Sequence, residues 1–183
     1  MKKILSVILI FGLTVAGLGG CGKEEPQENK NNLQESYGYV EKVTVDVLVA
    51  KFNTEVVDNS SLNPASTDYL TETDNQYWYG LIEGLYLVVI PEKYTGDKAV
   101  DVVDYTLLYV EKNGKYENDA VSYTKYLIRA NNSQITYPET DALLEEARTK
   151  SSSGKTANNG KGISIGYLEK EEAYQYQVLR AYK

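Results

Sequence analysis

Residues 43–57 carry two overlapping hydrophobic patterns. Alternation, which is typical of a β-strand, is shown by Val43, Val45, Val47 and Val49. Spacings of three and four, which are typical of a helix, are shown by Val45, Leu48, Phe52 and Val56. Because the helical spacing continues over more residues, we predict a helix ending near Asp58 and Asn59, although β-branched residues weaken helices. Residues 59–66 are then a loop.

Three segments in the middle of the chain have strand character. Residues 77–82 are rich in aromatic and branched side chains. Residues 85–90 are apolar throughout, which predicts a central strand covered on both faces and ended by Pro91. Residues 102–110 predict a further strand, which is closed by a turn at Asn113 and Gly114.

Two helices are predicted after this turn. The first has Asn118 or Asp119 as its cap and stops at Asn131-Asn132, and its apolar stripe is Ala120, Tyr123, Leu127 and Ala130. The second begins at residues 136–139, where Thr136 and Glu139 have capping-box spacing around Pro138. Its buried stripe is Leu143, Leu144 and Ala147, and Glu146 and Lys150 form a supporting ion pair.

The chain ends in a predicted hairpin. A flexible polar loop, residues 151–162, leads to apolar strands at residues 163–168 and 173–182, which are separated by the charged residues 169–172. An isolated hairpin is only marginally stable in water, so this one is expected to pack on the earlier strands.

This order of elements predicts one α+β domain over residues 37–183. We expect a two-layer structure, with an antiparallel sheet and about three helices packed mainly on one face. Cystatin-like and NTF2-like folds have this general shape, by analogy only.

The N-terminus has the pattern of an export signal. Lys2 and Lys3 are followed by an uncharged, mainly apolar stretch, residues 4–18. Spanning a membrane takes roughly 20 apolar residues. This stretch is shorter, and two glycines and then charged residues follow it. We therefore predict a cleaved signal peptide over residues 1–20.

The sequence Leu18-Gly19-Gly20-Cys21 resembles the lipobox of bacterial lipoproteins. The resemblance implies a diacylglycerol on the thiol of Cys21, cleavage before this residue and frequent acylation of the new N-terminus. An ordinary signal peptide with an incidental cysteine is the alternative. We expect lipidation at Cys21 and a location on the outer face of the cell membrane.

The segment between Cys21 and the domain is predicted to be a tether. Residues 22–36 contain Leu33 as their one apolar side chain, and a flexible coil of this length reaches about 20 Å. Cleavage removes Lys2 and Lys3 and leaves 17 basic against 26 acidic side chains, a net charge of −9. The lipid, and not a basic patch, would then hold the protein at the membrane.

Composition excludes several kinds of chemistry. The 183 residues include no histidine and a single cysteine, so imidazole catalysis, His-ligated metal sites and Cys-only metal sites are excluded. The net charge of −7 argues against nucleic-acid binding. We expect no cofactor and no metal.

The remaining motifs are weak. Residues 153–156 (Ser-Gly-Lys-Thr) lack the first glycine of a phosphate loop, and residues 58–63 lack the glycine and final glutamate of a calcium loop. Ser122 and Lys125 have S-x-x-K spacing without its companion motifs. Glu169, Glu171 and Glu172 could offer paired carboxylates for glycoside hydrolysis, but they lie in a predicted turn, where charges are usually solvated.

Tyrosine is unusually frequent, with 17 residues, and the densest aromatic cluster is Tyr77-Trp78-Tyr79. Most of these rings are expected to pack on the sheet, but an exposed group would suit a protein or glycan partner. On a strand, Trp78 points away from Tyr77 and Tyr79, so either Trp78 or the two tyrosines face outward.

Three functions follow from these observations. The first is a non-enzymatic, lipid-anchored protein that binds a protein or glycan of the cell envelope. The second is a small envelope hydrolase, which predicts carboxylates converging in one pocket with raised pKa values. The third is a structural subunit of a secretion or conjugation assembly, which predicts a flat apolar patch.

Overall fold

The computed structural model describes residues 38–66, 71–73 and 75–182. Its strands are β1 (Thr71–Thr73), β2 (Gln76–Ile82), β3 (Leu85–Pro91), β4 (Val103–Glu111), β5 (Ala157–Asn158), β6 (Ile163–Glu169) and β7 (Ala173–Arg180). Its helices are α2 (Val45–Asn59), α3 (Ala120–Asn131) and α4 (Tyr137–Lys150), with short 3₁₀ helices η1 (Glu117–Asp119) and η2 (Ser151–Ser153). The predicted signal peptide, Cys21 and the tether lie outside the described residues.

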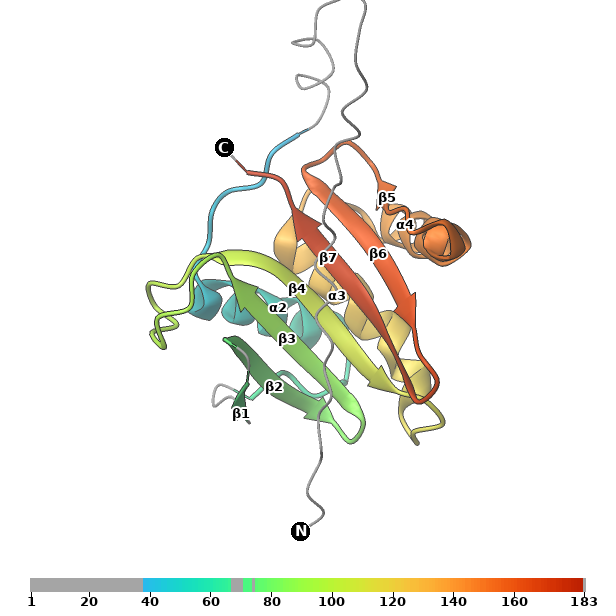
Figure 1. The fold of residues 1–183 in the computed structure, drawn as a ribbon, viewed down its shortest axis with the longest axis horizontal. Coiled ribbons are helices and arrows are strands. Elements are labelled where there is room, and N and C mark those ends of the chain that lie inside the picture. Colours follow the sequence, from blue (N-terminus) through green and yellow to red (C-terminus); the bar gives the residue numbers. More distant parts are fainter. Residues whose placement is uncertain (1–37, 67–70, 74, 183) are drawn as a thin grey trace, which may run out of the picture. The chain divides into compact units, whose positions relative to one another are not determined.

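The described strands form one antiparallel sheet in the order β1-β2-β3-β4-β7-β6-β5 (Figure 1). The chain runs through β1 to β4 as neighbours, crosses over through α3 and α4, and returns through β5 to β7. The β6–β7 hairpin therefore lies beside β4, as its need for a partner predicts.

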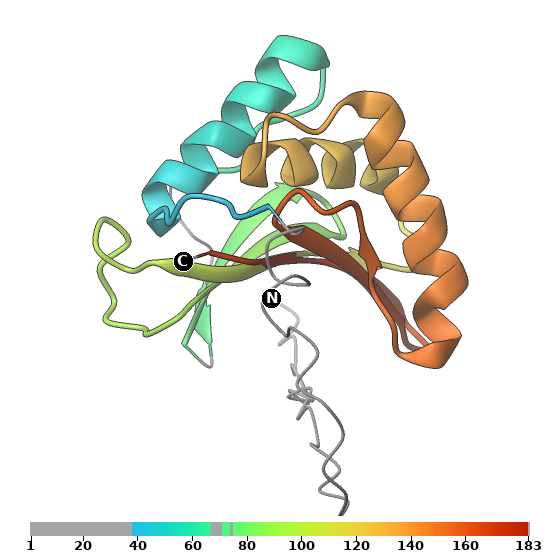
Figure 2. The ribbon, with the colours of Figure 1, turned by 90° about the horizontal axis from the view of Figure 1, so that it is seen from above.

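All three α-helices of the described residues lie on one face of the sheet (Figure 2). Helix α3 packs on β4 and β7, α4 packs on β5 and β6, and α2 packs on α3. The predicted α+β class, with helices on one face of an antiparallel sheet, is confirmed. None of these helices has the length and apolar content that a transmembrane span requires.

Helix α2 follows the three-and-four spacing of its apolar residues. Leu48, Phe52 and Val56 are fully buried, whereas Val47 and Val57 are exposed. Burial of this stripe outweighs the low helix propensity of its valines. The predicted helix, including its end at Asn59, is confirmed.

Helices α3 and α4 also match their predicted bounds. The capping box of α4 forms, and the Thr136 backbone N–H donates to Glu139 Oε2 at 2.7 Å. A hydrogen bond from the Lys161 ammonium, followed by those from Thr136, lowers the pKa of Glu139 to about 2. The ion pair between Glu146 and Lys150 is also present. Asp119 caps α3 without a side-chain hydrogen bond.

The predicted central strand is β3, which lies between β2 and β4 and has fully buried residues on both of its sides, although the described helices lie over one face only. Leu85, Leu87 and Val89 face the helices, and the described residues place no element over the opposite face. Val88 is fully buried on that face, where it pairs with Trp78 on one side and Leu107 on the other.

Candidate functional site

The predicted cluster on β2 divides between the two faces of the sheet. Tyr77 and Tyr79 point to the helices, and their side chains are 0% and 1% exposed. Trp78 lies on the opposite face and is half-buried. Of the two arrangements open to the sequence, the structure has Trp78 outward, so Tyr77 and Tyr79 are not available to a partner at the surface.

Trp78 belongs to a cluster of three rings from three adjacent strands. Its ring centroid lies 6.0 Å from that of Tyr86 on β3 and 5.7 Å from that of Tyr109 on β4. The Tyr86 and Tyr109 centroids are 6.2 Å apart, and these two residues pair directly across β3 and β4. The Nε1–H of Trp78 is buried and has no hydrogen-bond acceptor among the described residues.

This cluster is part of a larger surface, which we call the open face. Strand register and side-chain alternation place fourteen residues of β2, β3, β4 and β7 on it. They are Gln76, Trp78, Gly80, Tyr86, Val88, Ile90, Tyr105, Leu107, Tyr109, Glu111, Ala173, Gln175, Gln177 and Leu179. Glu111, at the end of β4, is the one charged residue among them, and Figure 2 shows that the described helices all lie on the other side. Its aromatic and aliphatic side chains are half-buried, except Val88, Leu107 and Ala173, which are buried, and a contiguous apolar surface without a covering helix is a candidate for an interaction site.

Sequence reasoning missed Tyr86, Tyr105 and Tyr109 as members of the site. All three are half-buried on the open face. The alternation within each predicted strand shows which of its residues point to the same side, and this was available from the sequence. The register that brings the three strands into line was not, because no local signal specifies it.

Acidic side chains gather at one end of the open face. Glu83 lies in the β2–β3 turn, Glu111 at the end of β4 and Glu172 in the β6–β7 turn, and all three are exposed. None of these carboxylates forms an ion pair with a described residue. Burial, followed by the charges of Glu111 and Glu83, raises the pKa of Tyr86. Burial, followed by Glu111 and Glu172, does the same for Tyr109.

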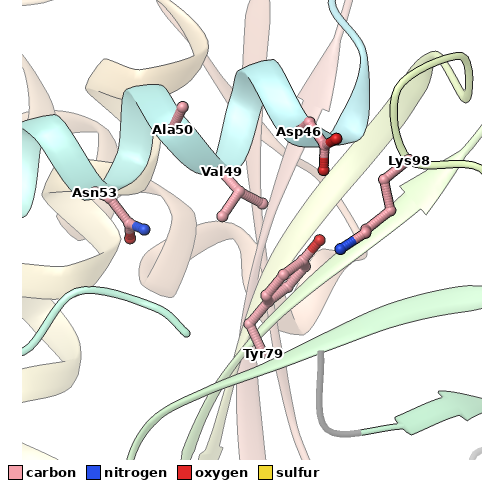
Figure 3. A pocket seen from close by; sticks show the side chains of 6 residues that line it. All are labelled: Asp46, Val49, Ala50, Asn53, Tyr79 and Lys98. Carbon is pink, nitrogen blue, oxygen red and sulfur yellow. The ribbon is translucent and has the colours of Figure 1, made fainter. Parts of the chain in front are cut away.

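A separate pocket lies on the helix side of the sheet (Figure 3). Its volume is about 340 Å³, and its lining residues are Asp46, Val49, Ala50, Asn53, Tyr79 and Lys98. The side chains of Asp46, Tyr79 and Lys98 point towards the same space. The Asn53 side-chain amide is already hydrogen-bonded within the protein, since it donates to the Ala65 carbonyl at 3.0 Å and accepts from the Ala65 N–H at 2.8 Å.

This pocket lacks the paired carboxylates that the hydrolase hypothesis requires. Asp46 is the one carboxylate among its described lining residues. In the described residues, the carboxyl groups with a shifted pKa are all lowered, namely Glu92, Asp101, Glu139 and Glu169. A general acid at neutral pH needs a raised pKa. The described carboxylates therefore give the hydrolase hypothesis no support.

Residues of the weak sequence motifs form ion pairs or lie outside the structural context that the motif requires. The Lys125 ammonium pairs with Asp141 at 2.5 Å, and the Glu169 carboxylate pairs with Lys112 at 2.6 Å. Residues 153–156 follow α4 and precede β5, so they do not join a strand to a helix. Within the described part of the chain, no group of three or more Cys, Asp or Glu residues is arranged to hold a metal ion.

Comparison with protein-family models, with curated proteins and with solved structures finds no match to this chain.

Proposed function

We propose that this chain is a lipid-anchored protein of the bacterial cell envelope that binds a partner through its open face. The anchor is supported by Leu18-Gly19-Gly20-Cys21 after an uncharged apolar stretch. Binding is supported by the aromatic, largely uncharged surface that the described helices leave uncovered. The single observation that carries the proposal is this surface, because Tyr and Trp are enriched where proteins meet.

A structural subunit of an envelope assembly is the second candidate. It is favoured by the same face, which is a broad sheet surface whose charged side chains lie at one end. In an assembly the open face would contact neighbouring subunits, whereas a binding protein would contact a separate partner. The two differ in what crosslinks to the face.

Replacement of Cys21 by alanine tests the anchor. We expect the Cys21→Ala protein to lose incorporation of labelled fatty acid and to leave the membrane fraction, because the chain has no second thiol for the lipid. Metabolic labelling and fractionation of intact cells measure both effects. Label retained on the Cys21→Ala protein would show that the lipid is attached elsewhere.

A photo-crosslinking residue at Tyr105 tests the open face. We expect irradiation of intact cells to give a discrete product, with a mass set by the partner. The same residue at Val57, which is exposed on α2, is the matched control and is expected to give none. Products of equal yield from the two positions would contradict binding by the open face. A ladder of multiples of the chain's own mass would favour the assembly subunit.

A further inference from the structure

The acidic end of the open face is formed by backbone contacts between three turns. The Glu111 N–H donates to the Gly84 carbonyl at 2.8 Å, which holds the end of β4 against the turn that carries Glu83. The Lys112 N–H donates to the Glu172 carbonyl at 3.0 Å. Glu83, Glu111 and Glu172 are therefore fixed together beside Tyr86 and Tyr109, although they are far apart in the sequence. We call these three residues with the two tyrosines the acidic end.

The cations close to this end are mostly engaged elsewhere. Lys112 pairs with Glu169 at 2.6 Å, and Lys115 lies 4.8 Å from the centre of the Tyr116 ring. Lys170, in the same turn as Glu172, borders Tyr109 and forms no ion pair with a described residue. The charge of Lys115 also interacts with that of Glu83, so two lysines, Lys115 and Lys170, stand against three carboxylates, and the acidic end keeps an excess of negative charge.

We propose that the acidic end binds a lysine- or arginine-rich segment of a partner protein. This inference rests on the proposed function of the open face and names the chemistry of its partner. A cationic side chain attracts both the face of a tyrosine ring and a nearby carboxylate. One lysine or arginine can therefore interact with the tyrosine rings and the glutamates of the acidic end at the same time. The rest of the open face then contacts the apolar and polar side chains around the basic segment.

Other occupants fit the acidic end less well. Two copies joined with their acidic ends facing would bring six carboxylates together, and each mature chain carries a net charge of −9. Anionic lipid and nucleic acid are repelled for the same reason. A glycan would use the rings and the glutamines, but its binding would gain nothing from Glu83, Glu111 or Glu172.

Titration of the full-length protein in a neutral detergent with a short, fluorescein-labelled lysine–arginine peptide tests this inference. We expect saturable binding by anisotropy, weakened roughly tenfold when sodium chloride rises from about 0.05 M to about 0.5 M. Trp78 is the only tryptophan of the chain, so its emission reports whether the peptide reaches the open face. A glutamate-rich peptide of equal length is expected not to bind.

Matched variants separate local charge from net charge. Glu83→Gln with Glu111→Gln is expected to weaken peptide binding about tenfold, and Lys170→Gln to strengthen it about threefold. Glu41→Gln with Glu145→Gln changes the net charge equally at exposed positions outside the acidic end and is expected to have little effect. Equal weakening by the two double variants, or binding without a change in Trp78 emission, would overturn the inference.

The inference and the proposed function fail in different ways. One result is that the peptide does not bind, while the photo-crosslink from position 105 persists in the Glu83→Gln, Glu111→Gln protein. The open face then has a partner, but positive charge on that partner is not what the face recognises. That result overturns the inference alone. If the photo-crosslinking residue at position 105 gives no specific product in the protein that keeps Glu83 and Glu111, the proposed function fails as well.

Discussion

Replacement of Phe52 by alanine is expected to lower the free energy of unfolding by about 3–5 kcal/mol. The Phe52 side chain is 0% exposed, and its ring stacks on that of Tyr123 with the centroids 6.3 Å apart. It lies between Leu48 and Val56 in the stripe by which α2 joins the core. The substitution removes a whole ring from this layer, and the surrounding helices can fill the cavity only in part.

Val57→Ala on the same helix is the matched control for Phe52→Ala. Val57 is 60% exposed, and its replacement is expected to change the stability by less than about 0.5 kcal/mol. Urea unfolding of the purified proteins, followed by circular dichroism, measures both. A loss for Phe52→Ala no larger than the loss for Val57→Ala would mean that α2 is not packed through this stripe.

Helix α2 shows how far hydrophobic spacing can be trusted. Val45 and Val49 fit both the strand and the helix patterns, so neither decides between them. Phe52 and Val56 decide, because they continue the helical spacing beyond the last alternating valine. Helix α4 was still better specified, since a capping box, a proline in the first turn and an apolar stripe agree.

Strands β1 and β5 could not be predicted because they are too short to show a pattern. They contain three and two residues and exist as additions to the edges of β2 and β6. Their pairing is a property of the assembled sheet, and no local pattern encodes it. The continuous apolar run of β3 did predict a central strand, and β3 lies between β2 and β4. Such a run does not specify which elements cover each face.

The candidate site was predicted in part. The sequence identified Tyr77-Trp78-Tyr79 and the alternation that sends Trp78 away from its neighbours, but it could not choose the outward side. That choice depends on which face the helices cover. The acidic end depends on contacts between turns that are remote in the sequence, and such contacts follow only from the register of the whole sheet.

Replacement of Asp101 by alanine is expected to lower the free energy of unfolding by about 3 kcal/mol. Its side chain is 2% exposed and accepts hydrogen bonds from Tyr77 Oη at 2.6 Å, the Thr95 N–H at 2.9 Å and Thr95 Oγ1 at 2.5 Å. Its own carbonyl accepts from the Val45 N–H at 3.0 Å. Asp101 thus joins the loop before β4 to β2 and to the start of α2, and its loss leaves three donors without this acceptor.

The same carboxylate makes part of the stability dependent on pH. Burial by itself raises the pKa of Asp101, but hydrogen bonds from Thr95 and Tyr77 outweigh it, and the pKa in the folded protein lies below the ordinary value. A lowered pKa stabilises the folded state above the pKa of the unfolded chain, about 3.9, and this contribution is lost as the pH falls through the folded value.

Asp101→Asn tests the charge of this acceptor while nearly preserving its shape. Urea unfolding at a series of pH values is expected to show the full difference from the unmodified protein near neutral pH and a shrinking difference below about pH 4. Asp104→Asn, at an exposed carboxylate in the following strand, removes the same charge and is expected to have little effect at any pH. A difference for Asp101→Asn that stays constant as the pH falls would mean that the buried oxygen atoms, and not their ionised form, hold the loop.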